Sequence, residues 1–140
     1  MIKPEIAGNK ITIPSSTEFL PDVDMFIEGI LRGYGTNEST IADIAISVSE
    51  LVNNAISHGS ADKDDSKVVV EINKNTDVVS VIVVDEGTGF DPNELADPLA
   101  QENLLKEVGR GIFIVKSLMD SVDIEPSPNG TRIIMKKSIK

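Results

Sequence analysis

A stripe of apolar residues at helical spacing constrains the fold of this chain more than any other feature of its sequence. It lies between Asn37 and Ser57 and comprises Ile41, Ile44, Ala45, Val48, Leu51, Val52 and Ala55. This spacing predicts a long amphipathic helix that must bury one face against another layer. A similar stripe predicts a helix over Phe19 to Leu31, which Gly33 and Gly35 end.

Strand-like runs supply the layer against which such helices can pack. Lys10 to Ile13 alternates polar and apolar residues, and a hairpin pattern joins Lys67–Asn73 to Val78–Val84. Val122–Glu125 and Thr131–Lys136 form another pair around a Pro-Asn-Gly turn. With a third helix before the last pair, the predicted order is β-α-α-β-β-loop-α-β-β. We therefore expect an α+β two-layer sandwich, in which helices cover one face of a mixed, largely antiparallel sheet.

A polar connection precedes the third helix. Asp91 to Val108 contains two prolines, and the helix is expected to follow Gly109 and to extend to about Met119. Long ordered loops inside compact domains are often lids or binding loops. The 140 residues suit one domain, 1–140, with a lid around 91–108.

Charge and composition exclude several classes of function. The formal net charge of −10 argues against a nucleic-acid partner, because phosphate backbones are bound through Lys and Arg. The apolar runs are too short to cross a bilayer, so no membrane partner is expected. Cysteine is absent, which excludes disulfides and cysteine-based zinc sites. A cytoplasmic protein is the expectation.

The end of the long helix carries the first candidate site. Glu50 and Asn54 are four residues apart and therefore share a helical face. Taken alone, an ordinary solvated helix face is the better explanation of this pair. Alternatively, an Asn carbonyl can offer Mg²⁺ the hard oxygen ligand that it prefers, and the Glu can accept a proton during phosphoryl transfer.

Two glycine-containing turns are further candidates. Asp85-Glu86-Gly87-Thr88-Gly89 follows a buried strand, where a carboxylate can accept a hydrogen bond from an exocyclic amine such as that of adenine. Gly109-Arg110-Gly111 is predicted to open the third helix, and free N–H groups at a helix start bind phosphates. Each motif alone is also typical of an ordinary turn or a loop-to-helix junction.

The order of these motifs resembles the GHKL (Bergerat-fold) ATPase superfamily over essentially the whole chain. The phrases Ser49–Gly59 and Gly109–Val115, with Leu118-Met119-Asp120, look closest to the stand-alone anti-sigma-factor serine/threonine kinases. The resemblance implies an ATP and Mg²⁺ site in which Glu50 is the catalytic base and Asn54 binds the metal. It also implies that Asp85 holds the adenine amine with support from Thr131. Gly87 and Gly89 would shape the adenine side, and Gly109, Arg110 and Gly111 would face the phosphates.

The same resemblance implies the partners. They are a sigma factor, an anti-sigma-factor antagonist that is the phosphorylation target, or a second copy of the chain. The first helix departs from the family pattern, because it carries Asp22, Asp24 and Glu28 and its only arginine, Arg32, lies at the far end. The alternative is a nucleotide-gated switch that binds partners without kinase activity.

Overall fold

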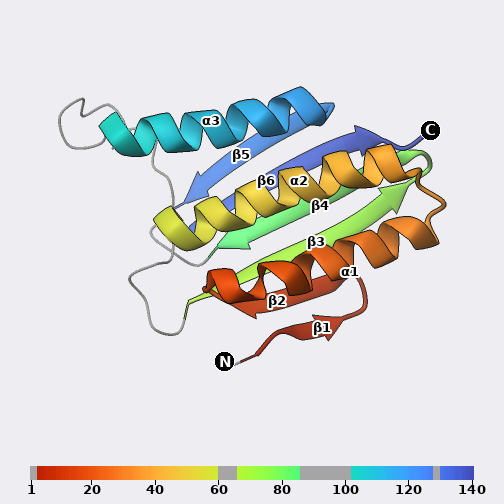
Figure 1. Cartoon of the computed structure of the whole chain (residues 1–140), viewed down its shortest axis with the longest axis horizontal. Helices are drawn as coiled ribbons and strands as arrows, with labels where there is room; N and C mark the ends of the chain where they lie inside the picture. Colours follow the sequence, from red (N-terminus) through yellow and green to blue (C-terminus); the bar gives the residue numbers. More distant parts are fainter. Residues whose placement is uncertain (1–2, 60–65, 86–101, 128–129) are drawn as a thin grey trace.

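A computed structural model describes residues 3–59, 66–85, 102–127 and 130–140. Consecutive pairs of strands are separated by helices along the chain (Figure 1). The strands are β1 (Glu5–Ala7), β2 (Lys10–Pro14), β3 (Lys67–Asn75), β4 (Val78–Asp85), β5 (Ser121–Ser127) and β6 (Gly130–Ser138). The helices are α1 (Leu20–Gly33), α2 (Glu38–Asn54) and α3 (Glu102–Leu118), with a short helical turn η1 (Thr17–Phe19) before α1 and a π-helical turn η2 (Ala55–Gly59) after α2.

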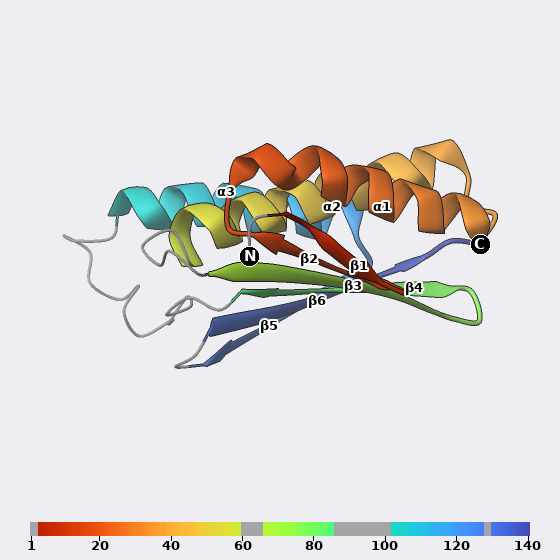
Figure 2. The same ribbon diagram turned by 90° about the horizontal axis from the view of Figure 1, so that it is seen from below.

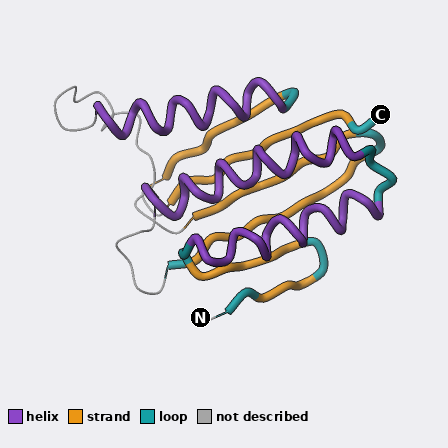
Figure 3. Tube along the Cα trace, in the orientation of Figure 1, coloured by secondary structure: helices purple, strands orange, loops and turns teal. Residues whose placement is uncertain are grey.

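The described strands form one six-stranded sheet in the order β1-β2-β3-β4-β6-β5. Every pairing is antiparallel, so the sheet is antiparallel rather than mixed. All three helices lie on one face of it (Figure 2). The helices run side by side across that face, as the Cα trace coloured by secondary structure shows (Figure 3). The predicted two-layer α+β sandwich is therefore confirmed.

The core lies between the two layers and explains why these residues form these elements. The apolar stripe of α2 is buried except at the half-buried Ala45, and Val23, Ile27 and Leu31 of α1 are buried as well. From the sheet, alternate residues of β3 and β4 face the same core. Asn37 caps α2, because its side-chain oxygen accepts a hydrogen bond from the Thr40 amide at 2.8 Å.

Two parts of the fold differ from the sequence prediction. Strand β1 was missed: its three residues are all exposed, and Gly8, with φ of +63°, turns the chain into β2. Helix α3 begins at Glu102 rather than after Gly109, so residues 102–108 belong to the helix. The rest of the predicted lid, 91–101, lies outside the described residues.

Contacts with the last strand fix the end of α3. Lys137 Nζ donates a hydrogen bond to the Leu118 carbonyl at 2.6 Å, and the Ser138 amide donates one to Asp120 Oδ2 at 2.7 Å. The first of these satisfies a carbonyl that the helix end would otherwise leave unpaired. Helix α3 is thereby held over the sheet and beside α2.

Candidate nucleotide and catalytic site

The polar face at the end of α2 is only partly open to solvent. Glu50 and Asn54 are both half-buried, whereas the adjacent Asn53 is exposed. Burial of Leu51, Val52 and Ala55 against the core fixes the helix rotation that gives Glu50 and Asn54 this orientation. The first candidate pair therefore does not lie on an ordinary solvated face.

Glu50 and Asn54 both face α3 at Gly111. A β-carbon at Gly111 would come within 2.7 Å of Asn54 Nδ2 and 3.3 Å of Glu50 Oε2. Gly111 is buried, as is Val115 one turn further along the same face of α3. A glycine at this position lets the two helices approach while the two polar side chains remain between them.

The predicted role of the Gly109-Arg110-Gly111 segment as a helix start is wrong in one respect. These residues lie inside α3, more than a turn beyond its first residue, Glu102. Amides in a helix interior are bonded to carbonyls of the preceding turn, so they do not offer the free N–H groups of a helix N-terminus. Arg110 itself is exposed.

A buried carboxylate and a buried hydroxyl lie opposite each other at the end of the ladder between β4 and β6. Asp85, the last residue of β4, pairs in register with Thr131 of β6. Paired residues of antiparallel strands project to the same face. Their exposed fractions are 7% and 4%, respectively, and both take part in interactions within the protein. The two other predicted residues of the adenine side, Gly87 and Gly89, lie outside the described residues.

The Glu50–Asn54 pair and the Asp85–Thr131 pair lie at the same end of the molecule. The end of α2, the end of β4 and the start of β6 lie at the same side of the domain, and η2 contacts β4 there (Figure 1). Ser66 is a third buried polar residue at this end, immediately before β3, and sequence reasoning missed it. Its signal was the alternation of Val68, Val70 and Ile72, which extends back to Ser66.

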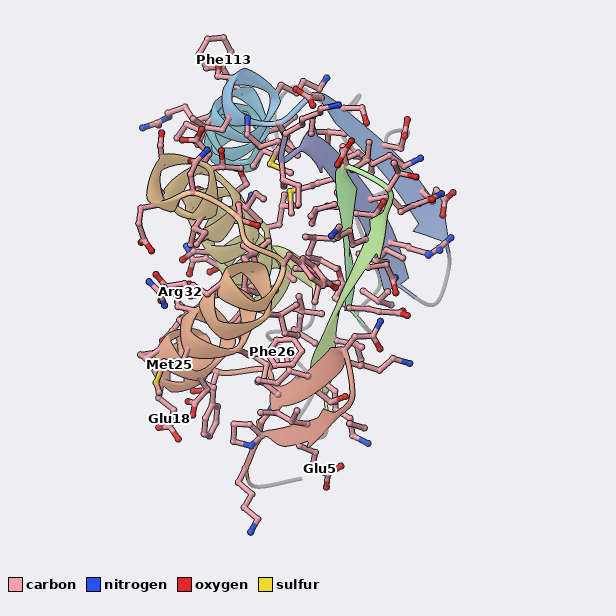
Figure 4. The ribbon with its side chains drawn as sticks, turned by 90° about the vertical axis from the view of Figure 1, so that its right-hand side faces the viewer. Glu5, Glu18, Met25, Phe26, Arg32 and Phe113 are labelled. Carbon is pink, nitrogen blue, oxygen red and sulfur yellow. The ribbon has the colours of Figure 1, made fainter. Side chains whose placement is uncertain are left out.

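An open groove of about 330 Å³ runs along the outer side of α1 and α2, and Glu50 is part of its wall. The other lining residues are Asp24, Glu28, Ala45, Ile46 and Ser49. Partial burial, and then the neighbouring charge of Glu28, raise the pKa of the Asp24 carboxyl. Arg32, near the end of α1 (Figure 4), is not among the residues that line this groove, and its side chain pairs with that of Glu38 at 3.3 Å.

The donor set fits a magnesium–nucleotide complex better than a resident metal ion. Among the described residues, no three His, Cys, Asp or Glu side chains are grouped to hold a metal. Mg²⁺ often takes only one or two protein oxygens and completes its shell with phosphate oxygens and water. The half-buried Asn54 amide can supply such an oxygen, and the buried Asp85 can accept a hydrogen bond from a base.

Known proteins share both this fold and this sequence pattern. A serine-protein kinase RsbW of Staphylococcus aureus is 28% identical over 94% of this chain and 86% of its own length. An anti-sigma F factor of Clostridium beijerinckii is 34% identical over 69% of this chain and 70% of its own.

Solved structures share the fold of this chain. The structure of RsbU and RsbW domains from Mycobacterium tuberculosis superposes with a TM-score of 0.69 at 21% identity. That match covers 93% of this chain, which spans about a third (31%) of the solved one. A histidine kinase domain of Erythrobacter litoralis superposes with a TM-score of 0.61 at 21% identity, covering 96% of this chain and 66% of that one. The model of the histidine kinase-like ATPase domain matches residues 13–137, and the chain belongs to this family.

Proposed function

We propose that this protein is an ATP-dependent serine/threonine kinase that acts as an anti-sigma factor and phosphorylates an anti-sigma-factor antagonist. The observation that carries the proposal is the placement of Glu50 one turn before Asn54, with both side chains half-buried and directed toward α3. A protein that only bound nucleotide would have no need of a carboxylate there. The names of its relatives, a serine-protein kinase and an anti-sigma F factor, support the same assignment.

The adenine end of the site is built on β4 and β6. Asp85 would accept a hydrogen bond from the exocyclic amine, and Thr131, opposite it in the ladder, would support that end. A carboxylate shielded from water discriminates well between ligands, because a mismatched group would leave it unpaired. Gly87 and Gly89 would allow the backbone to approach the base.

The phosphate end of the site is built on α2 and α3. Asn54 would bind Mg²⁺ through its carbonyl oxygen, and Gly109, Arg110 and Gly111 would face the phosphates. When bound, the metal ion neutralises negative charge on the phosphate oxygens. Arg110 is exposed, and a guanidinium can bind phosphate oxygens through two parallel hydrogen bonds.

Glu50 would act as the general base. Its carboxylate would accept the proton of the target serine or threonine hydroxyl as that oxygen attacks the terminal phosphorus. The groove between α1 and α2 leads to Glu50 and offers a route by which a partner's side chain can reach it. No helix in the described part of the chain is long and apolar enough to span a membrane. We expect the protein to act in the cytoplasm on a sigma factor or its antagonist, alone or as a homodimer.

One observation favours the second candidate, a nucleotide-gated switch that binds partners without phosphoryl transfer. The α1 side of the groove carries Asp24 and Glu28, and Arg32 is not among its lining residues. Incubation of the protein with γ-labelled ATP and candidate antagonist proteins separates the two functions. Label on a partner serine or threonine supports the kinase, whereas nucleotide-dependent binding without any label supports the switch.

A further inference from the structure

The described part of the chain contains two buried side-chain hydroxyls without a hydrogen-bond partner, Thr36 Oγ1 and Ser66 Oγ. Ser66 is 5% exposed and Thr36 is 8% exposed. A buried hydroxyl that makes no hydrogen bond loses its bonds to water and gains nothing in return, so it lowers stability. Thr36 lies in the connection between α1 and α2, whereas Ser66 lies at the end of the sheet that carries Asp85.

The strand register places Ser66 beside Asp85. Val68 of β3 pairs with Asp85 of β4, and Ser66 comes two residues before Val68. Ser66 immediately precedes β3, and like Val68 and Asp85 it is buried, so all three side chains lie on the side of the sheet that the helices cover. A diagonal neighbour of this kind lies about 7 Å away, a separation that the edge of an aromatic base can bridge.

Ser66 differs from the other polar groups at this end of the core. Asp85 and Thr131 already have interaction partners within the protein, whereas Ser66 Oγ has no hydrogen-bond partner among the residues that the structure describes. The backbone of Ser66 is held firmly, because its carbonyl accepts a hydrogen bond from the Ser15 amide at 3.0 Å. The hydroxyl is thus a buried donor, attached to an anchored backbone, that makes no hydrogen bond with the described residues.

We propose that Ser66 is an adenine-selecting residue whose hydroxyl donates a hydrogen bond to ring nitrogen N1, directly or through one water. This inference rests on the proposed ATP-binding function. The edge of adenine presents a donor, its exocyclic amine, beside an acceptor, N1. A carboxylate can only accept, so Asp85 suits the amine, and the adjacent N1 needs a separate donor. Ser66 and Thr131 are both buried at this end, and of these two hydroxyls it is that of Ser66 that makes no hydrogen bond with the described part of the chain.

Calorimetric titration of the full chain with Mg·ATP and with Mg·1-deaza-ATP, which lacks the N1 acceptor, tests the proposal. The wild-type protein is expected to bind ATP about 3–10-fold more tightly than the deaza analogue, the usual effect of one hydrogen bond. Ser66→Ala is expected to bind the two ligands equally. Thr36→Val, which removes the other unpaired buried hydroxyl far from the site, is expected to keep the wild-type preference.

Thermal unfolding separates this role from a structural one. Both substitutions remove an unsatisfied buried hydroxyl, so both should leave the Tm unchanged or raise it. A Ser66→Ala protein that keeps the full preference for ATP would overturn the inference and leave the proposed function intact.

Wild-type protein that binds ATP and the deaza analogue equally would also overturn it, whether or not the variant folds. Wild-type protein that binds neither ligand would overturn the inference and the proposed function together. Ser66→Cys, which preserves size but donates weakly, provides the second variant and should also lose the preference.

Discussion

A β-carbon on Gly111 of α3 would lie 2.7 Å from the side-chain nitrogen of Asn54 on α2. Gly111→Ala should therefore displace the Asn54 amide, which can rotate away, while the fold survives. We expect weaker Mg·ATP binding by calorimetry with a largely unchanged Tm. Gly29→Ala is the matched control: nothing lies within 4 Å of its β-carbon, and alanine in a helix should stabilise by about 0.5–1 kcal/mol. Unchanged Mg·ATP affinity in Gly111→Ala would show that this contact does not shape the site.

Asn54 and Asn53 are neighbours in α2 with different surroundings, and this difference tests the metal assignment. Asn54→Ala should weaken Mg·ATP binding more than the binding of nucleotide in the presence of a chelator. Asn53→Ala removes an exposed amide and should change neither. Calorimetry in both conditions measures the effect, and equal losses with and without Mg²⁺ in Asn54→Ala would argue against metal binding at this residue.

Asp85 should select ATP over GTP. Guanine presents a carbonyl where adenine presents an amine, so the buried carboxylate would lose a hydrogen bond and meet repulsion. The expected preference is about 1–3 kcal/mol, and Asp85→Asn should greatly reduce it. Asp123→Asn, at an exposed position of β5, removes the same charge and should leave it unchanged. Equal affinities of the wild-type protein for the two nucleotides would refute this role.

Asp24 makes the free energy of unfolding depend on pH. Its pKa is raised above the ordinary value of 3.8 by partial burial and by Glu28, so the folded state binds this proton more tightly than the unfolded state does. The resulting stability is present below the ordinary pKa and is lost as the pH rises through the raised value. At neutral pH, Asp24→Asn should therefore raise the free energy of unfolding.

The size of this gain is limited because Asp24 is only partly buried, so solvent still screens its charge. We expect on the order of a few tenths of a kcal/mol in urea titrations at neutral pH, disappearing well below pH 3.8. Asp22→Asn removes the same charge from an exposed position in the first turn of α1, where a carboxylate is favourable, and should give a small loss instead. A gain for Asp24→Asn that persisted in acid would contradict this explanation.

The sequence predicted those elements whose pattern matches their burial. The stripe of α2 and the alternation of β3 and β4 appear in the structure as expected, because one face of each element is buried. Strand β1 carries no such pattern, since all its residues are exposed. The start of α3 was misplaced because glycine is a poor helix former, yet Gly109 and Gly111 lie within the helix. The close approach of Asn54 to Gly111 is a tertiary contact that local propensity does not register.

In the candidate site, too, local sequence patterns were predictable and contacts between distant elements were not. Helical spacing correctly placed Glu50 and Asn54 on one face, but it could not show that α3 covers that face. The pairing of Asp85 with Thr131 depends on the ladder between β4 and β6, which a single sequence does not specify. Ser66 was missed because a serine before a strand looks like an ordinary turn residue until its burial is known.

The central claim is that Glu50 is the general base of a protein kinase. Glu50→Gln keeps the size of the side chain and much of its hydrogen bonding but cannot accept the proton. Phosphoryl transfer from γ-labelled ATP to the antagonist should fall by about 10²–10⁴-fold while nucleotide affinity changes little. Glu38→Gln, at the other end of α2, should keep full activity, because its exposed ion pair with Arg32 contributes little. A fully active Glu50→Gln protein would contradict the account and leave the nucleotide-gated switch as the better explanation.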